Sequence, residues 1–192
     1  MSEDARALPP GALLRWAAGL YMVLAVAGVL WLGSRLGEIP LEFFVRADIW
    51  WLDAGVGLGT AAALIGAWQL ALAVSPMARE LEGTIAETLG PLTTTEVVAL
   101  ALLSGFAEEV FFRGAIQSAW GPIIATALFA LLHMGPGREF RLWTVFALVA
   151  GAAFGGLMVW RQTLLAPVLA HIAVNLVGLA RIRRKRPAES EP

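Results

Sequence analysis

The sequence predicts an all-α fold, a polytopic transmembrane helical bundle of about six spans with an amphipathic surface helix. Hydrophobic residues make up 58% of the 192 residues, whereas charged residues make up only 15%. Soluble domains carry about 25% charged residues, so this composition indicates a single domain, residues 1–192, embedded in a lipid bilayer. The formal net charge of −1 predicts no nucleic-acid partner, and the absence of cysteine excludes thiolate metal sites.

Two uncharged stretches predict the spans of the N-terminal part, residues 12–95. They cover residues 16–33 and 54–78, and a helix needs about 20 apolar residues to cross a bilayer core. Asp53 precedes the second stretch, and we interpret it as a helix-end residue because acidic side chains suit helix N-termini.

The surface helix is expected within residues 79–96, the most polar internal stretch. Leu81, Ile85 and Leu89 recur there at four-residue spacing. This spacing is typical of an amphipathic helix that lies on a membrane surface.

Residues 96–180 form the expected motif-bearing core and predict four further spans. These spans are expected at residues 96–120, 122–134, 142–160 and 162–180. Gly121-Pro122 separates the first two, because this dipeptide breaks helices. Residues 181–192 are interpreted as a basic and then disordered tail.

The basic residues predict the orientation of the bundle. With six spans, most of the fourteen Lys and Arg residues fall on the side that holds both termini. The positive-inside rule places that side in the cytoplasm. We therefore expect an integral membrane protein, in a prokaryotic plasma membrane, with both termini cytoplasmic.

A pair of adjacent carboxylates and an arginine interrupt the apolar core. Ionised groups inside a bilayer are costly and usually functional, so Glu108, Glu109 and Arg113 are candidate site residues. Glu109 and Arg113 lie four residues apart on one helical face and are expected to pair and to fix this helix. Glu108 is turned about 100° away, so its carboxylate stays available for chemistry.

Both histidines of the chain lie in predicted spans of the same half. His133 ends one span, and His171 shares a helical face with Asn175 in another. Each histidine alone is as often a structural hydrogen bonder as a functional group. Because helical bundles build sites from facing helices, the histidines, Asn175 and the glutamates together predict one site.

Three ordered motifs here resemble those of the CPBP family, also called the Abi, or CAAX protease and bacteriocin-processing, family. The motifs are Glu108-Glu109-x-x-x-Arg113, Phe129-x-x-x-His133 and His171-x-x-x-Asn175. The family consists of intramembrane proteases, often labelled metalloproteases, and includes the type II CAAX prenyl endopeptidases. The resemblance implies an endopeptidase that hydrolyses a membrane-associated peptide or protein.

Peptide hydrolysis needs an activated water, an oxyanion stabiliser and a proton donor for the leaving amine. Glu108 is the expected base, and His133 is expected to hold the same water and carry its proton. His171 and Asn175, one helical turn apart, are expected to donate hydrogen bonds to the oxyanion. These roles agree with those that the resemblance implies.

A zinc-dependent mechanism is the open alternative. Two histidines and one glutamate, with water in the fourth position, form a known catalytic zinc set, here His133, His171 and Glu108. This set leaves Glu109 as the only nearby base and gives Asn175 no duty. We therefore favour a mechanism that requires no cofactor.

Other protein classes account for these residues less well. A rhomboid-like protease needs a serine nucleophile in a Gly-x-Ser context, which Ser104 lacks, so we interpret Ser104 as a helix-packing residue. A proton-coupled transporter would also use intramembrane Glu and His. A non-catalytic membrane scaffold or immunity protein is the remaining alternative. Substrate identity and oligomeric state are not encoded in any pattern.

Overall fold

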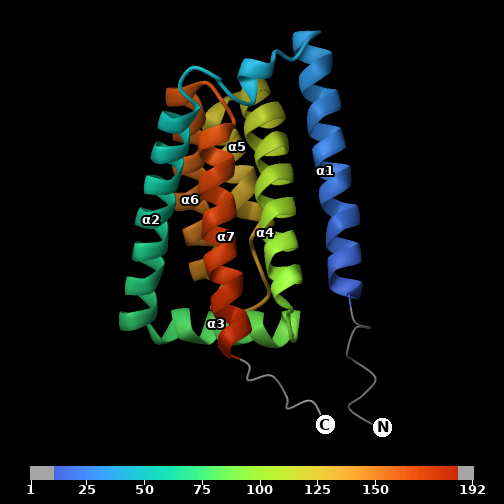
Figure 1. Cartoon of the computed structure of the whole chain (residues 1–192). Coiled ribbons are helices and arrows are strands. Elements are labelled where there is room, and N and C mark those ends of the chain that lie inside the picture. The colour runs from blue at the N-terminus through green and yellow to red at the C-terminus, as the bar shows by residue number, and fades with distance from the viewer. Residues whose placement is uncertain (1–10, 186–192) are drawn as a thin grey trace.

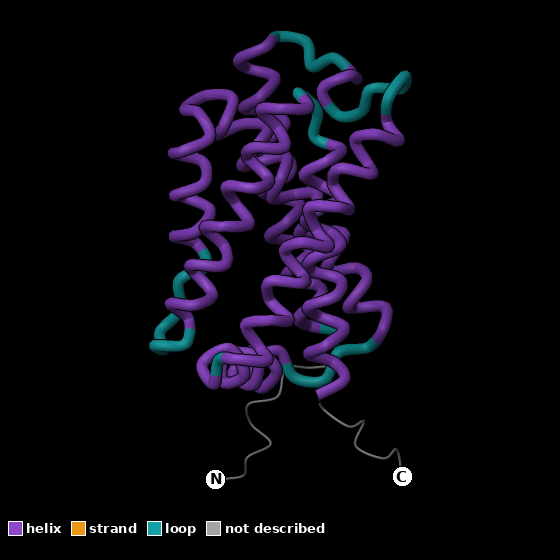
Figure 2. Tube along the Cα trace, turned by 90° about the vertical axis from the view of Figure 1, so that its left-hand side faces the viewer, coloured by secondary structure: helices purple, strands orange, loops and turns teal. Residues whose placement is uncertain are grey.

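The computed structural model describes residues 11–185, and within that range the chain forms helices and loops and no strand (Figure 1; Figure 2). The predicted all-α fold is therefore confirmed. The elements in chain order are α1 (Ala12–Leu36), η2 (Leu41–Phe43), α2 (Trp50–Val74), α3 (Pro76–Leu89), α4 (Thr94–Glu109), η3 (Val110–Ile116), α5 (Gln117–Leu132), α6 (Phe140–Arg161) and α7 (Leu165–Lys185).

Five of the described helices are long and apolar enough to cross a membrane. They are α1, α2, the continuous segment from α4 to α5, α6 and α7. The third of them runs over 39 residues, which is longer than the roughly 17–25 residues that one span needs. The protein is an integral membrane protein, and this long segment contains two arms.

Gly121 reverses the chain between the two arms. Its backbone has φ 84° and ψ 168°, a conformation open to glycine because it has no Cβ. Phe129, after the break, packs back onto Phe112, before the break, with ring centroids 5.2 Å apart. The predicted break at Gly121-Pro122 is present, and the expected fourth span is the short returning arm of a helical hairpin.

Helix α7 lies between α2 and α4, and α1 stands at the edge of the bundle against α4 and η3 (Figure 1). Glycines allow the two closest approaches to α7. A Cβ built on Gly105 of α4 would lie 2.5 Å from Cγ1 of Ile172, and one on Gly57 would collide with the carbonyl of Ala166. Real Cβ atoms do not approach so closely, so α4 and α7 meet backbone to backbone beside the motif residues.

The predicted surface helix is α3, which lies across one end of the bundle (Figure 1). It begins at Pro76, which suits the first position of a helix, and the Ser75 hydroxyl accepts a hydrogen bond from the amide of Ala78 at 3.3 Å. Ala78 and Leu81 are fully buried. The helix therefore fastens its apolar face onto the bundle.

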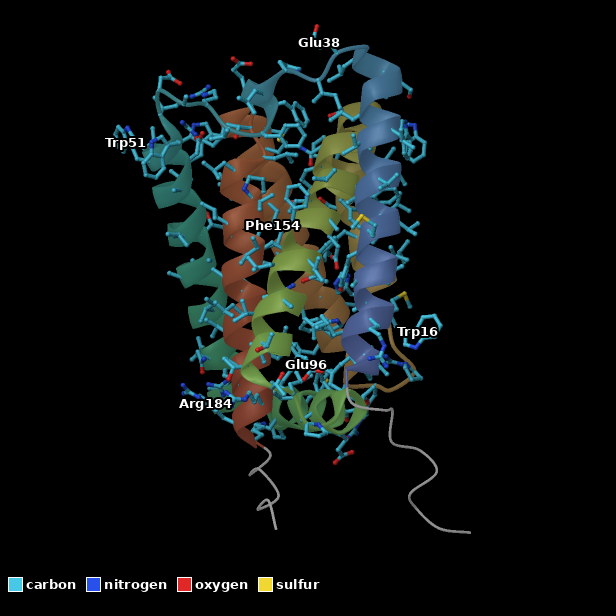
Figure 3. The ribbon with its side chains drawn as sticks, turned by 45° about the vertical axis from the view of Figure 1, so that its right-hand side comes forward. Trp16, Glu38, Trp51, Glu96, Phe154 and Arg184 are labelled. Carbon is cyan, nitrogen blue, oxygen red and sulfur yellow. The ribbon has the colours of Figure 1, made fainter. Side chains whose placement is uncertain are left out.

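Both described ends of the chain lie at the α3 end of the bundle. Figure 3 labels Trp16, Glu96 and Arg184 at that end, and Glu38 and Trp51 at the other. This arrangement agrees with the even number of crossings that the hydropathy pattern predicts.

The expected disorder from residue 181 onward is wrong for residues 181–185. Helix α7 continues through Lys185 because its basic side chains have a buried partner on α3. Glu82 accepts a hydrogen bond from Nε of Arg181 at 3.1 Å and forms an ion pair with Nζ of Lys185 at 2.5 Å. Residues 186–192 lie outside the described residues.

Asp53 has a partner that its position in the sequence does not reveal. It lies in the first turn of α2, as expected, but it is fully buried and pairs with Nε of Arg161 at 2.5 Å. Arg161 is in the last turn of α6. The pair therefore joins α2 to α6 at the end opposite α3.

Candidate active site

A capping box sets the start of the helix that carries the glutamates. The Thr93 hydroxyl accepts from the amide of Glu96 at 3.2 Å, and the Glu96 carboxylate accepts from the amide of Thr93 at 2.9 Å. These reciprocal bonds satisfy amides that a helix N-terminus leaves unpaired. The register of α4 from this start places Glu108 and Glu109 in its last turn.

The helix widens into a π-helix, η3, immediately after Glu109. π-helices are rare and are frequent at functional sites. Arg113 donates from Nη2 to the carbonyl of Gly151 at 3.0 Å, and Gln117 donates from Nε2 to the carbonyl of Gly155 at 3.0 Å. The wider turn therefore fixes η3 to the glycine-lined face of α6, which an α-helical reading of the sequence did not predict.

Glu109 contacts two basic side chains at once. Its Oε2 lies 3.2 Å from Nε of Arg113, the i, i+4 pair that the spacing predicts, and its Oε1 lies 2.8 Å from Nδ1 of His171. Glu109 and Arg113 are fully buried, and His171 is 4% exposed. A buried carboxylate needs such partners, so Glu109 links η3 to α7.

Aromatic rings enclose this linkage. The Arg113 guanidinium lies 4.7 Å from the ring centroid of Phe129, within cation–π range. His171 stacks on Phe154 with centroids 5.0 Å apart and an interplanar angle of 23°. The rings exclude water, and electrostatic interactions strengthen where the local dielectric constant is low.

Glu108 faces a different environment from its neighbour. It lines a cavity of about 310 Å³, together with Ser104, His133 and Asn175. Its Oε2 is buried and has no hydrogen-bond partner within residues 11–185. Glu108 therefore presents a carboxylate oxygen in the cavity that is available to a ligand.

His133 is held in one tautomer. Its Nδ1 lies 2.7 Å from the carbonyl of Phe129, and a carbonyl oxygen only accepts hydrogen bonds. Nδ1 therefore carries a proton, and Nε2 of the neutral ring is an acceptor. Because His133 lines the same cavity as Glu108, its Nε2 can accept a proton from water there.

The His171–Asn175 face is divided between two environments. Asn175 lines the cavity and donates from Nδ2 to the hydroxyl of Ser104 at 2.8 Å. Ser104 in turn donates to the carbonyl of Leu100 at 2.7 Å. His171 is not among the residues that line the cavity, and its Nδ1 contacts Glu109. The structure thus brings Glu108, His133 and Asn175 to one cavity, with His171 one helical turn before Asn175 on the Glu109 linkage.

Two residues of the site were not identified from the sequence. Ser104, interpreted as a packing residue, also receives the hydrogen bond of Asn175. Tyr21 of α1 lines the same cavity. A single tyrosine in the most N-terminal span gave a weak signal, because its proximity to α4 depends on tertiary packing.

The zinc alternative does not fit this arrangement. In the part of the chain that the structure describes, His, Cys, Asp and Glu side chains do not gather in groups of three that could hold a metal ion. Glu108, His133 and His171 therefore do not form a common ligand set, and we derive no step through zinc.

The fold and the site define a helical membrane protein with a paired-glutamate site. Residues 90–177 match the family described as "Type II CAAX prenyl endopeptidase Rce1-like". This range includes the three motifs, so the family resemblance is confirmed for the motif-bearing part.

A curated relative shares part of this segment. The chain is 35% identical over 89 residues to "Uncharacterized protein YpbD" of Bacillus subtilis (strain 168). The alignment covers 45% of this chain and 46% of the relative, so the chain spans less than half of that protein's length. No solved structure matches the chain.

The Glu109 linkage predicts the effect of removing its arginine. Arg113→Ala leaves Glu109 buried without its guanidinium partner, and breaking a buried pair in this way costs about 3–5 kcal/mol. We expect a clearly lower unfolding temperature of the purified protein in detergent. Arg138→Ala is the control, because its pair with Glu80 is exposed and such pairs contribute less than about 1 kcal/mol. Equal unfolding temperatures for the two variants would contradict the linkage.

Proposed function

We propose that the protein is an intramembrane endopeptidase that hydrolyses a peptide bond of a membrane-associated peptide or protein through water activated by Glu108. The observation that carries the proposal is the carboxylate of Glu108, buried with an unpartnered oxygen in the cavity that His133 and Asn175 also line. The family match over the same segment supports it.

The first step is attack of water on the scissile carbonyl carbon. Water binds between the Glu108 carboxylate and Nε2 of His133, the nitrogen that is free to accept because Nδ1 donates to Phe129. Glu108 takes one proton as the new C–O bond forms. The tetrahedral intermediate then breaks its C–N bond, and this proton passes to the leaving amine.

Asn175 stabilises the oxyanion of this intermediate without losing its resting contact. A side-chain amide nitrogen has two hydrogens, and the bond to Ser104 uses one. The second hydrogen is available to the substrate oxygen. Preorganised donors of this kind stabilise the transition state because they need little rearrangement during the reaction.

His171 donates to the oxyanion only as an imidazolium. Its Nδ1 proton is used by Glu109, so Nε2 carries a proton only when the ring is charged.

The cavity favours an apolar segment of the substrate. Besides the site residues, its wall is mostly apolar and extends to Glu82 and Arg181 at the α3 end. The apolar side chains include Leu100, Ile65, Trp68, Phe146 and Val174.

We place the α3 end and both termini in the cytoplasm of a prokaryotic cell, because most basic residues lie on that side. The substrate then enters from the cytoplasmic side.

Replacement of Glu108 tests the base directly. Glu108→Gln keeps the size of the side chain and removes the basic carboxylate, so we expect cleavage to fall by roughly 10² to 10⁴. Membrane proteomics of cells that carry this variant identifies the precursor that accumulates, and purified protein in liposomes then gives the rate on that substrate. Glu87→Gln, on the exposed side of α3, is the matched control. Full activity of Glu108→Gln would favour the non-catalytic scaffold instead.

Metal removal tests the cofactor-free mechanism. We expect peptide hydrolysis to persist after exhaustive chelation, because Glu108, His133 and Asn175 each have a role without a metal. The measurement is turnover together with bound metal in the same preparation. Activity that is lost when stoichiometric bound zinc is removed, and that returns when zinc is added back, would establish the zinc-dependent alternative.

A further inference from the structure

Tyr21 brings α1 into a site that the sequence motifs assign to other helices. It is the only tyrosine in the chain, and it lies outside the family-matched residues 90–177. Its side chain lines the cavity of Glu108, and its hydroxyl interacts with both Glu108 and Ser104. A polar group from the edge helix thus reaches the proposed base.

The hydroxyl of Tyr21 is the available donor between two acceptors. Ser104 gives its own proton to the carbonyl of Leu100, so it is an acceptor toward Tyr21. An ionised Glu108 is also acceptor-only. Because hydrogen bonds to a charged acceptor are the stronger ones, the hydroxyl of Tyr21 donates its hydrogen bond to the carboxylate of Glu108.

Close packing fixes the height of Tyr21 along α4. Gly28 lies seven residues, or about two turns, after Tyr21 and so occupies the same face of α1. A Cβ built on Gly28 would lie 3.0 Å from Cα of Phe111. The backbone of α1 therefore rests directly on η3, three residues beyond Glu108, and holds Tyr21 in register with the site.

We propose that Tyr21 is a positioning residue that donates a hydrogen bond to Glu108 and aims its second carboxylate oxygen at the attacking water. This inference rests on the proposed function and extends it to α1. When Glu108 takes the proton of water, the hydroxyl of Tyr21 transfers its hydrogen bond to Ser104. The oxygen of Ser104 has one lone pair engaged by Asn175 and a second that can accept.

The single tyrosine allows a test that does not depend on turnover. Protein labelled with ¹³Cζ-tyrosine gives one ring-carbon NMR signal, which responds to the charge that its hydroxyl faces. We expect Glu108→Gln to shift this signal and Glu87→Gln to leave it unchanged. A signal that is identical in wild type and Glu108→Gln would overturn the contact, whether or not the protein proves to be a protease.

Tyr21→Phe tests the catalytic consequence. It keeps the ring and removes the hydroxyl, so we expect kcat to fall by roughly 10-fold with KM unchanged, the scale of a charge-assisted hydrogen bond. Trp16→Phe, at an exposed position of α1, should leave both constants unchanged. An unchanged kcat in Tyr21→Phe would overturn the positioning role. If Tyr21→Phe does not fold, the NMR comparison of ¹³Cζ-tyrosine-labelled wild type and Glu108→Gln decides the proposal.

Discussion

The Glu109 carboxylate, shared between Arg113 and His171, is the interaction on which the motif-bearing half of the protein depends. Arg113 also donates to the carbonyl of Gly151, so this carboxylate connects η3, α6 and α7 in the interior. Leaving any of these charges buried and unpaired is costly. The linkage also distinguishes two adjacent glutamates, because Glu109 pairs with Arg113 and His171 while Glu108 lines the cavity.

The features that the sequence predicted correctly depend on local rules. The four-residue spacing of Glu109 and Arg113 predicts their pair because those positions share a helical face. The break at Gly121-Pro122 follows from the backbone preferences of the two residues. The uncharged stretches predict the membrane helices for the same reason, since length and hydropathy are properties of each segment alone.

The features that were missed depend on contacts between distant segments. Asp53 and Arg161 are 108 positions apart, and no local sequence pattern indicates that the two side chains pair. Arg181 was predicted to lie in a disordered tail. Its helical conformation depends on a contact with Glu82 of α3, which the sequence does not reveal. Likewise the π-helix forms where Arg113 reaches α6, and no local pattern distinguishes it from an α-helix. Tyr21 belongs to the site only because α1 packs on η3.

The most direct test compares the two neighbouring glutamates by the same isosteric change. Thermal unfolding of Glu109→Gln and Glu108→Gln is measured in one detergent. Loss of the charged partner of Arg113 and His171 costs about 3 kcal/mol or more, so Glu109→Gln should unfold roughly 6 °C or more below wild type. Glu108→Gln should stay within about 2 °C of wild type, because the ion pairs of Arg113 and His171 are with Glu109 and the glutamine carbonyl still accepts a hydrogen bond from Tyr21. Equal losses in the two variants, or a larger loss in Glu108→Gln, would contradict the division of roles.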